Sequence, residues 1–172
     1  IGLLDDNADI RAGEMAYLSR DITQLTNKQW RELRGTEIGL IPQDPNNSLN
    51  PVKTIGESVG EGLAIHKIGT KEQRKQKVIE LLGRVGIDHP EKRYDQYPHE
   101  LSGGMKQRVL IAAAVALEPK LIIADEPTSA LDVTVQKVIL DLLDDMREEL
   151  GLGILFITHD LAVAGECADH IA

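Results

Sequence analysis

Cysteine and aromatic residues are scarce in this chain of 172 residues. The sequence has one cysteine, one tryptophan and one phenylalanine, and aromatic residues make up 3% of it. The lone Cys167 excludes an internal disulfide, and we expect it to be a buried structural thiol rather than a reactive one. With so few aromatic side chains there is no array on which nucleic-acid bases could stack, and we expect Trp30 to be a packing residue.

Basic residues are also fewer than acidic residues. The 19 Lys and Arg residues against 28 Asp and Glu residues give a formal net charge of −9. This balance argues against a general electrostatic grip on DNA, RNA or an anionic membrane surface. The sequence has no apolar run of the roughly 20 residues that a membrane-spanning helix needs, and no secretory leader. We therefore expect a soluble, cytoplasmic chain, and its length fits one globular domain.

A phosphate-binding loop of the form Gly-x-x-x-x-Gly-Lys-[Ser/Thr] is missing, because the dipeptide Gly-Lys occurs nowhere. In that loop, backbone N–H groups and the lysine hold the β- and γ-phosphates, and the hydroxyl holds Mg²⁺. The chain also opens at Ile1 without an initiator methionine and closes at Ala172 inside an apolar pattern. Residues 1–4 look like the last turn of a helix already under way. We expect a fragment.

Phosphate-binding chemistry is nevertheless indicated at residues 101–105, Leu-Ser-Gly-Gly-Met. Ser102 is a natural helix N-cap, and Gly103 and Gly104 let backbone N–H groups approach an anion where the helix dipole favours negative charge. The sequence predicts a helix over residues 102–117 that ends before Pro119. Taken alone, these residues fit an ordinary capped turn equally well.

Three short apolar segments read as strands, at residues 37–42, 121–126 and 153–158. The second ends in Asp125 and Glu126, whose carboxylates suit a metal and a water, and the third is followed by His159. Between them, Asp132 begins a predicted helix that ends at Gly151, with an apolar stripe formed by Val135, Val138, Ile139, Leu142, Leu143 and Met146. Continuous apolar strands alternating with helices predict a parallel sheet covered by helices, with these polar residues at one edge.

Two capping boxes and a charged helical region fill the rest. Thr26 with Gln29, and Thr70 with Gln73, each predict a helix start. Residues 54–99 are charged and helical in character, and the cluster of basic residues after Thr70 is interleaved with glutamates. We therefore expect a solvated helix face there rather than a nucleic-acid patch.

Together these motifs resemble the nucleotide-binding domain of ATP-binding cassette (ABC) ATPases. These motifs stand in the order and spacing of that family, and the resemblance runs from end to end. Met105 occupies the place of the usual signature glutamine. The matching segments are the Q-loop of the oligopeptide/dipeptide importer subfamily at 42–45 and 48–51, the signature at 101–105, the Walker B strand at 121–126, the D-loop at 129–132 and the switch residue His159.

The resemblance implies a P-loop NTPase (RecA-like) α/β fold, a parallel sheet covered by helices with an inserted helical subdomain. It divides residues 1–172 into a partial core with the Q-loop at 1–53, a helical subdomain with the signature at 54–118, and a core with Walker B, D-loop and switch histidine at 119–172. The phosphate loop and the aromatic residue that stacks on adenine would lie upstream, so the chain would carry half of a composite site.

The resemblance also implies roles for individual residues. Asp125 and Gln43 would hold Mg²⁺. Glu126 would orient or deprotonate the attacking water, and His159 would contact the γ-phosphate. The nucleotide-binding residues would be Asp125 and the D-loop residue Asp132, together with Ser102, Gly103 and Gly104, which would act in trans on ATP held by a partner.

The function that the resemblance implies is an ATP-binding subunit of an ABC importer, an ATPase whose hydrolysis of ATP drives transport, with peptides as the cargo. Its partners would be a second ABC ATPase subunit, transmembrane permease subunits and, indirectly, an extracytoplasmic substrate-binding protein, but no nucleic acid. It would lie peripherally on the cytoplasmic face of the cell membrane. Two alternatives stay open: a catalytically silent fragment, or a soluble ABC ATPase of DNA repair or the ribosome, although no coiled-coil insertion or tandem cassette is seen.

Overall fold

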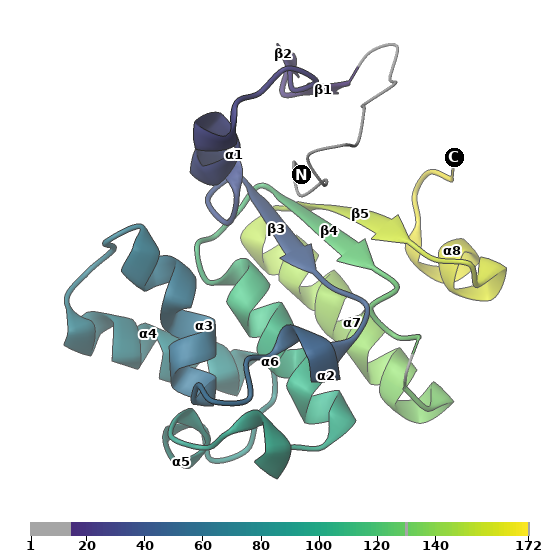
Figure 1. Cartoon of the computed structure of the whole chain (residues 1–172). Coiled ribbons are helices and arrows are strands. Elements are labelled where there is room, and N and C mark those ends of the chain that lie inside the picture. The colour runs from purple at the N-terminus through teal and green to yellow at the C-terminus, as the bar shows by residue number, and fades with distance from the viewer. Residues whose placement is uncertain (1–14, 130, 172) are drawn as a thin grey trace.

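A three-stranded parallel sheet forms the centre of the chain (Figure 1). The computed structural model describes residues 15–129 and 131–171. The helix end expected at residues 1–4, and residue 130 of the D-loop, lie outside this part. The strands are β3 (Ile38–Ile41), β4 (Leu121–Asp125) and β5 (Gly153–Ile157), in the order β3-β4-β5. The three strands predicted from the sequence are therefore confirmed, each ending one residue earlier than expected.

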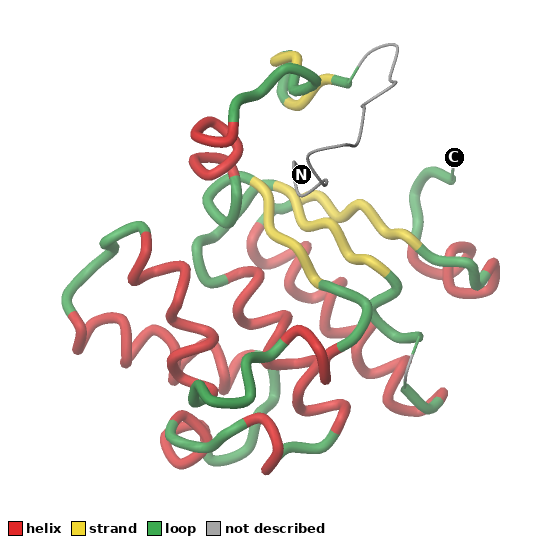
Figure 2. The backbone as a smooth tube through the Cα atoms, viewed as in Figure 1, coloured by secondary structure: helices red, strands yellow, loops and turns green. Residues whose placement is uncertain are grey.

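Helices cover one face of this sheet (Figure 2). Helix α6 (Gly103–Val115) and helix α7 (Val133–Leu150) share one apolar core with the strand residues Ile41, Ile122 and Ala124, which are almost completely buried. Parallel pairing sets Ile123 beside Leu155 and Asp125 beside Ile157 on the opposite face. There Leu155 and Ile157 keep 52% and 45% of their surface exposed. Within the described residues β5 pairs with β4 alone, so its other edge is open.

The segment before β3 has a small core of its own. Strands β1 (Ala16–Tyr17) and β2 (Arg20–Asp21) form an antiparallel pair, and α1 (Asn27–Leu33) follows them. The capping box of Thr26 and Gln29 opens α1 as predicted. Trp30 is 5% exposed and packs with Ile22 and Leu33, which confirms its packing role.

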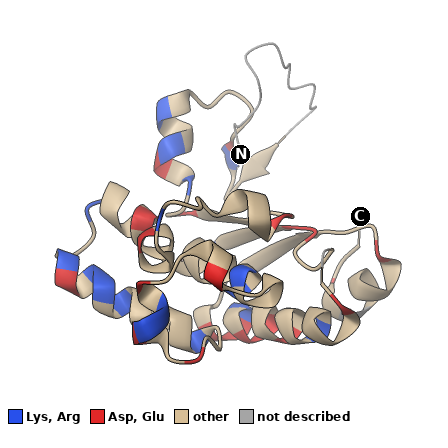
Figure 3. Ribbon diagram, turned by 60° about the horizontal axis from the view of Figure 1, so that its bottom comes forward, with Lys and Arg blue, Asp and Glu red and all other residues tan. Residues whose placement is uncertain are grey.

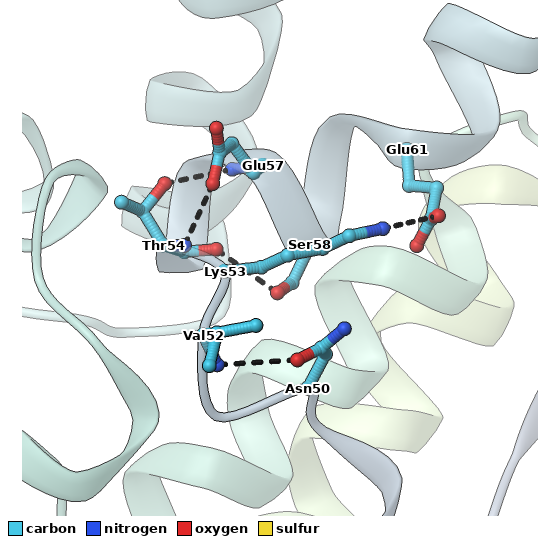
Figure 4. A network of polar contacts seen from close by, with 7 residues as sticks. All are labelled: Asn50, Val52, Lys53, Thr54, Glu57, Ser58 and Glu61. Atoms are coloured by element: carbon cyan, nitrogen blue, oxygen red, sulfur yellow. Dashed lines mark hydrogen bonds and ion pairs between the residues drawn. The ribbon is translucent and has the colours of Figure 1, made fainter.

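Further helices surround α6 on the side away from α7. They are α3 (Ile55–Ile65), α4 (Lys71–Arg84), α5 (Pro90–Tyr94) and a short 3-10 helix (Pro98–Glu100). The predicted box of Thr70 and Gln73 opens α4. A third box, which the sequence reading missed, opens α3: the backbone N–H of Thr54 donates to Glu57 Oε2 over 2.9 Å, and Glu57 N–H returns a 3.2 Å bond to Thr54 Oγ1 (Figure 4).

The basic residues of α4 are engaged locally, and positive and negative residues are interleaved along the helices (Figure 3). The Nζ atom of Lys77 lies 2.7 Å from Glu118, Lys75 lies over the ring of Tyr94, and Arg74 donates to the carbonyl of Gly69. These contacts fit the solvated helix face expected from the sequence.

Two expectations about apolar positions were wrong. Val138 belongs to the predicted stripe of α7, but it is 41% exposed because it lies at the margin of the buried face. Cys167 is exposed rather than buried, since α8 (Leu161–Cys167) lies at the end of the described chain with few covering elements. The predicted end of α7 is correct: Gly151 takes a left-handed conformation with φ of 62°, and its N–H donates to the carbonyl of Arg147.

Candidate active site

Three polar side chains that the sequence reading selected meet at the carboxyl ends of the strands. Nδ1 of His159 lies 2.8 Å from Oε1 of Glu126, and Nε2 of Gln43 donates to Oε2 of Glu126 over 2.9 Å. These residues follow β5, β4 and β3 respectively. Residues separated by 83 and 33 positions in sequence come together because parallel strands deliver their carboxyl ends to the same edge.

The backbone turns sharply at Glu126. This residue has a φ of 43°, in the left-handed region, and its N–H donates to the carbonyl of Ile157 on β5 over 2.9 Å. A non-glycine residue held at positive φ is uncommon, and active sites are among the places where such residues cluster. The turn directs the Glu126 side chain toward His159 and Gln43.

The charge of Glu126 acts on His159. The hydrogen bond to Glu126 and the charge of its carboxylate raise the pKa of His159 above its ordinary value, and Asp160 adds to this effect. The His159 side chain is 77% exposed, whereas that of Glu126 is 23% exposed. Each carboxylate oxygen of Glu126 accepts one of the two bonds, and a carboxylate has about four lone-pair positions. The carboxylate therefore keeps acceptor capacity for a water molecule.

An open cavity of about 130 Å³ adjoins this cluster. It brings together the end of β4, the D-loop and the segment after β5. Thr128, which is 8% exposed, and Ser129 lie on one side, and the hydroxyl of Thr158 accepts a hydrogen bond from the Asp160 backbone on the other. The residues lining it are Glu126, Thr128, Ser129, Leu131, Gln136, Thr158, His159 and Asp160. Sequence reasoning did not single out Thr128 or Gln136, because neither stands in a motif that carries chemistry.

The residues at this sheet edge fit Mg²⁺ only if water and substrate phosphates supply the remaining ligands. Across residues 15–129 and 131–171, no group of three or more His, Cys, Asp or Glu side chains could hold a metal ion. Asp125 ends β4 and Gln43 follows β3, so one carboxylate and one amide oxygen stand at this sheet edge. Mg²⁺ commonly keeps several waters and binds through one or two carboxylates plus the phosphates of a substrate. These residues fit that arrangement.

The signature residues form an exposed helix start. Ser102 is the N-cap of α6, and its Oγ accepts a 3.4 Å bond from the Met105 N–H. A Cβ at Gly103 would meet nothing within 4 Å, whereas one at Gly104 would lie 2.9 Å from Cγ1 of Val135 on α7. Packing therefore explains Gly104, while the missing side chain at Gly103 leaves open space beside a helix N-terminus. None of Ser102, Gly103 and Gly104 lines the cavity beside Glu126.

Aspartates cap the helices on both sides of the cavity. Oδ1 of Asp132 accepts a 3.0 Å bond from the Val135 N–H at the start of α7. Oδ1 of Asp160 accepts a 2.9 Å bond from the Ala162 N–H at the start of α8. Both side chains thus fix a helix start in this structure, and a nucleotide contact by Asp132 stays a prediction.

The parallel sheet, its polar edge and the helices around α6 have the fold of solved ATP-binding cassettes. Residues 2–129 match the sequence profile described as ABC transporter, so the chain belongs to the ABC transporter family.

Among curated proteins, the chain is 49% identical over 162 residues to the oligopeptide transport ATP-binding protein OppD of Bacillus subtilis, covering 94% of this chain and 45% of OppD. It is 47% identical to the dipeptide transport ATP-binding protein DppD of Haemophilus influenzae, covering 99% of this chain and 52% of DppD. The chain therefore spans about half the length of these relatives.

Solved structures agree with the fold. The ATP-binding cassette MJ0796, in a dimeric post-hydrolysis state bound to ADP and Pi, is 33% identical with a TM-score of 0.77, covering 90% of this chain and 66% of that one. CbiO1 of Clostridium perfringens, part of the transporter complex cbiONQ, is 33% identical with a TM-score of 0.78, covering 92% and 61%. Among the helices that the structure describes, none is both long and apolar enough to cross a membrane.

Proposed function

We propose that the whole protein containing this chain is the ATP-binding subunit of an ABC importer that couples ATP hydrolysis to the uptake of peptides. The observation that carries the proposal is the contact of Gln43 and His159 with the two carboxylate oxygens of Glu126, at 2.9 and 2.8 Å. The names of the relatives OppD and DppD, at 49% and 47% identity, support peptides as the cargo.

In this mechanism Glu126 is the general base. Its carboxylate accepts a proton from the attacking water, and the two donors hold the carboxylate in one orientation. His159 stands at the mouth of the cavity, where its protonated imidazole is a donor for the γ-phosphate. Mg²⁺, when bound, neutralises charge that develops on the phosphates. Asp125 would hold the metal, and the amide oxygen of Gln43 would face it while its Nε2 stays on Glu126.

A second cassette completes the site. The open start of α6 at Ser102 and Gly103 presents backbone N–H groups and a helix dipole to an anion. The same residues lie outside the cavity beside Glu126. This separation supports a contact in trans, with the signature of one cassette on the ATP of the other. The dimeric state of MJ0796 supports such an assembly.

We further propose the division into a core at 1–53 and 119–172 and a helical subdomain at 54–118. Permease subunits would receive the work of hydrolysis at the cytoplasmic face of the membrane, and a substrate-binding protein would deliver the peptide. The backbone bond from the Ile55 N–H to the Gln96 carbonyl joins the segment of the exposed Val52 to the segment that carries the stacked rings of Tyr97 and His99. This surface is our candidate for the permease contact.

The proposal is tested by reconstituting the whole protein with its permease and binding-protein partners in vesicles that contain ATP. Uptake of a labelled peptide together with stimulated phosphate release is the expected result. ATP hydrolysis without peptide uptake would overturn the cargo, and absence of hydrolysis would overturn the ATPase function.

A further inference from the structure

The first turn of α6 is hydrogen bonded to the turn that follows Gln43. The Nζ atom of Lys106 donates to Oδ1 of Asn46 across 2.7 Å, joining residues 60 positions apart in sequence. Asn46 belongs to α2 (Pro45–Ser48), which packs against α6. The backbone N–H of Lys106 donates to the Ser102 carbonyl over 2.9 Å. Lys106 therefore lies one helical turn beyond the N-cap that starts the signature helix.

The turn that Lys106 holds is itself stiff. Oδ1 of Asp44 accepts a 2.8 Å bond from the Asn46 N–H, and Oδ2 of Asp44 accepts a 2.7 Å bond from Nδ2 of Asn47. Because Asp44 directly follows Gln43, these bonds fix the backbone from which Gln43 reaches Glu126. Gln43 itself is exposed, so its reach of 2.9 Å to Glu126 depends on where this turn stands.

The opposite side of the same helix turn is also fixed. A Cβ at Gly104 would lie 2.9 Å from Cγ1 of Val135, so the start of α6 is in close contact with the first turn of α7. The start of α6 is thus held between α7 on one side and the turn after Gln43 on the other. The contact between α6 and the turn after Gln43 is polar and directional because Lys106 donates a hydrogen bond to Asn46.

We propose that Lys106 is a positioning residue for ATP hydrolysis: it holds Asn46, and with it the Asp44-capped turn, so that Gln43 stays on the Glu126 carboxylate. This inference rests on the proposed ATPase function. The bond is formed by a charged donor, and such bonds are shorter and stronger than neutral ones. Since Ser102 and Lys106 share one helix turn, a movement of the signature is passed to the Gln43 turn through this bond.

The test uses the whole protein and its steady-state ATP hydrolysis. We expect Lys106→Met to lower kcat by about tenfold or more while KM for ATP changes little, because a displaced catalytic group loses rate rather than substrate binding. Lys106→Arg keeps a charged donor and should restore most of kcat. Asn46→Ala removes the acceptor and should reproduce the loss, and the double variant should lose no more than either single variant.

Lys77→Met is the matched control, since Lys77 makes a bond of the same length, 2.7 Å, to Glu118 far from Gln43. It should leave kcat near that of the parent. The inference is overturned if Lys106→Met keeps kcat within about twofold of the parent, if Arg fails to rescue, or if the losses of Lys106→Met and Asn46→Ala add. Should Lys106→Met fold poorly, the exposed Asn46 gives the same test from the other side of the bond. A parent that hydrolyses no ATP overturns the proposed function and this inference with it.

Discussion

Replacing Glu126 by glutamine tests the assignment of the general base. The substitution Glu126→Gln keeps the size of the side chain but removes its charge and its ability to take a proton. In the structure both carboxylate oxygens face a nitrogen, Nδ1 of His159 at 2.8 Å and Nε2 of Gln43 at 2.9 Å. A glutamine amide offers one oxygen and one NH₂ group, so it can accept only one of the two hydrogen bonds that the carboxylate accepts.

The expected loss in the rate of ATP hydrolysis follows from the removal of a general base. Removal of a general base costs about 10²–10⁴ in rate, which corresponds to about 2.7–5.4 kcal/mol at about 1.36 kcal/mol for each factor of ten. The effect on folding should be small, because the His159 side chain is 77% exposed and water screens its interaction with Glu126. Binding of ATP should survive, since the base acts on water rather than on the nucleotide.

The assay is phosphate release by the whole protein, combined with calorimetric ATP titration and sedimentation of the dimer. Glu126→Gln should bind ATP, release almost no phosphate and remain dimeric longer than the parent in the presence of ATP. Asp144→Asn, an exposed carboxylate on α7 that pairs with Arg147, is the control and should keep its turnover. Turnover of Glu126→Gln within a few-fold of the parent would show that Glu126 is not the general base.

Three further predictions concern the signature, the histidine and the sheet edge. Gly103→Ala should reduce ATP hydrolysis but leave the thermal stability equal or higher, because a Cβ there meets nothing within 4 Å. Gly104→Ala should instead lower the free energy of unfolding by about 1–3 kcal/mol, because its Cβ would lie 2.9 Å from Val135. Retained activity in Gly103→Ala would contradict a nucleotide contact there. Glu126 raises the pKa of His159, so their interaction stabilises the fold below the ordinary histidine pKa and is lost as the pH rises through the raised value. An NMR titration should show a lower pKa of His159 in Glu126→Gln than in the parent, and an unchanged pKa would contradict the contact. The 172-residue chain by itself should self-associate through exposed Leu155 and the edge of β5 that no strand of the described residues pairs with. A monodisperse monomer in light scattering with one cooperative unfolding transition would defeat this.

Most of the fold could be predicted from local signals in the sequence. The boxes at Thr26 and Thr70 were visible because a threonine precedes a glutamine by three residues. The equivalent box at Thr54 was missed although Glu57 follows it, since the helix it opens contains several glycines that lower helix propensity. Packing overrides that propensity: a Cβ at Gly56 would collide with the ring of Tyr94, so glycine is required where α3 meets α5.

The place of the site at one edge of the sheet could be predicted from the sequence, but the contacts within the site could not. The strand ends placed Glu126 and His159 at one edge of a parallel sheet, and the resemblance to ABC ATPases added Gln43. Their contacts depend on the strand order β3-β4-β5, and spacing along the chain does not determine which strands are neighbours. The bond of Lys106 to Asn46 joins two segments that carry no shared pattern, so only the folded structure reveals it.

We propose that this chain carries the catalytic half of a nucleotide site, and its sequence lacks the phosphate-binding loop. Titration of MgATP into the 172-residue chain, by calorimetry with parallel phosphate release, tests it most directly. We expect no saturable binding in the micromolar range and no steady hydrolysis, because the missing loop supplies most of the charge-assisted contacts to the triphosphate. Micromolar affinity together with sustained phosphate release by the chain would contradict it.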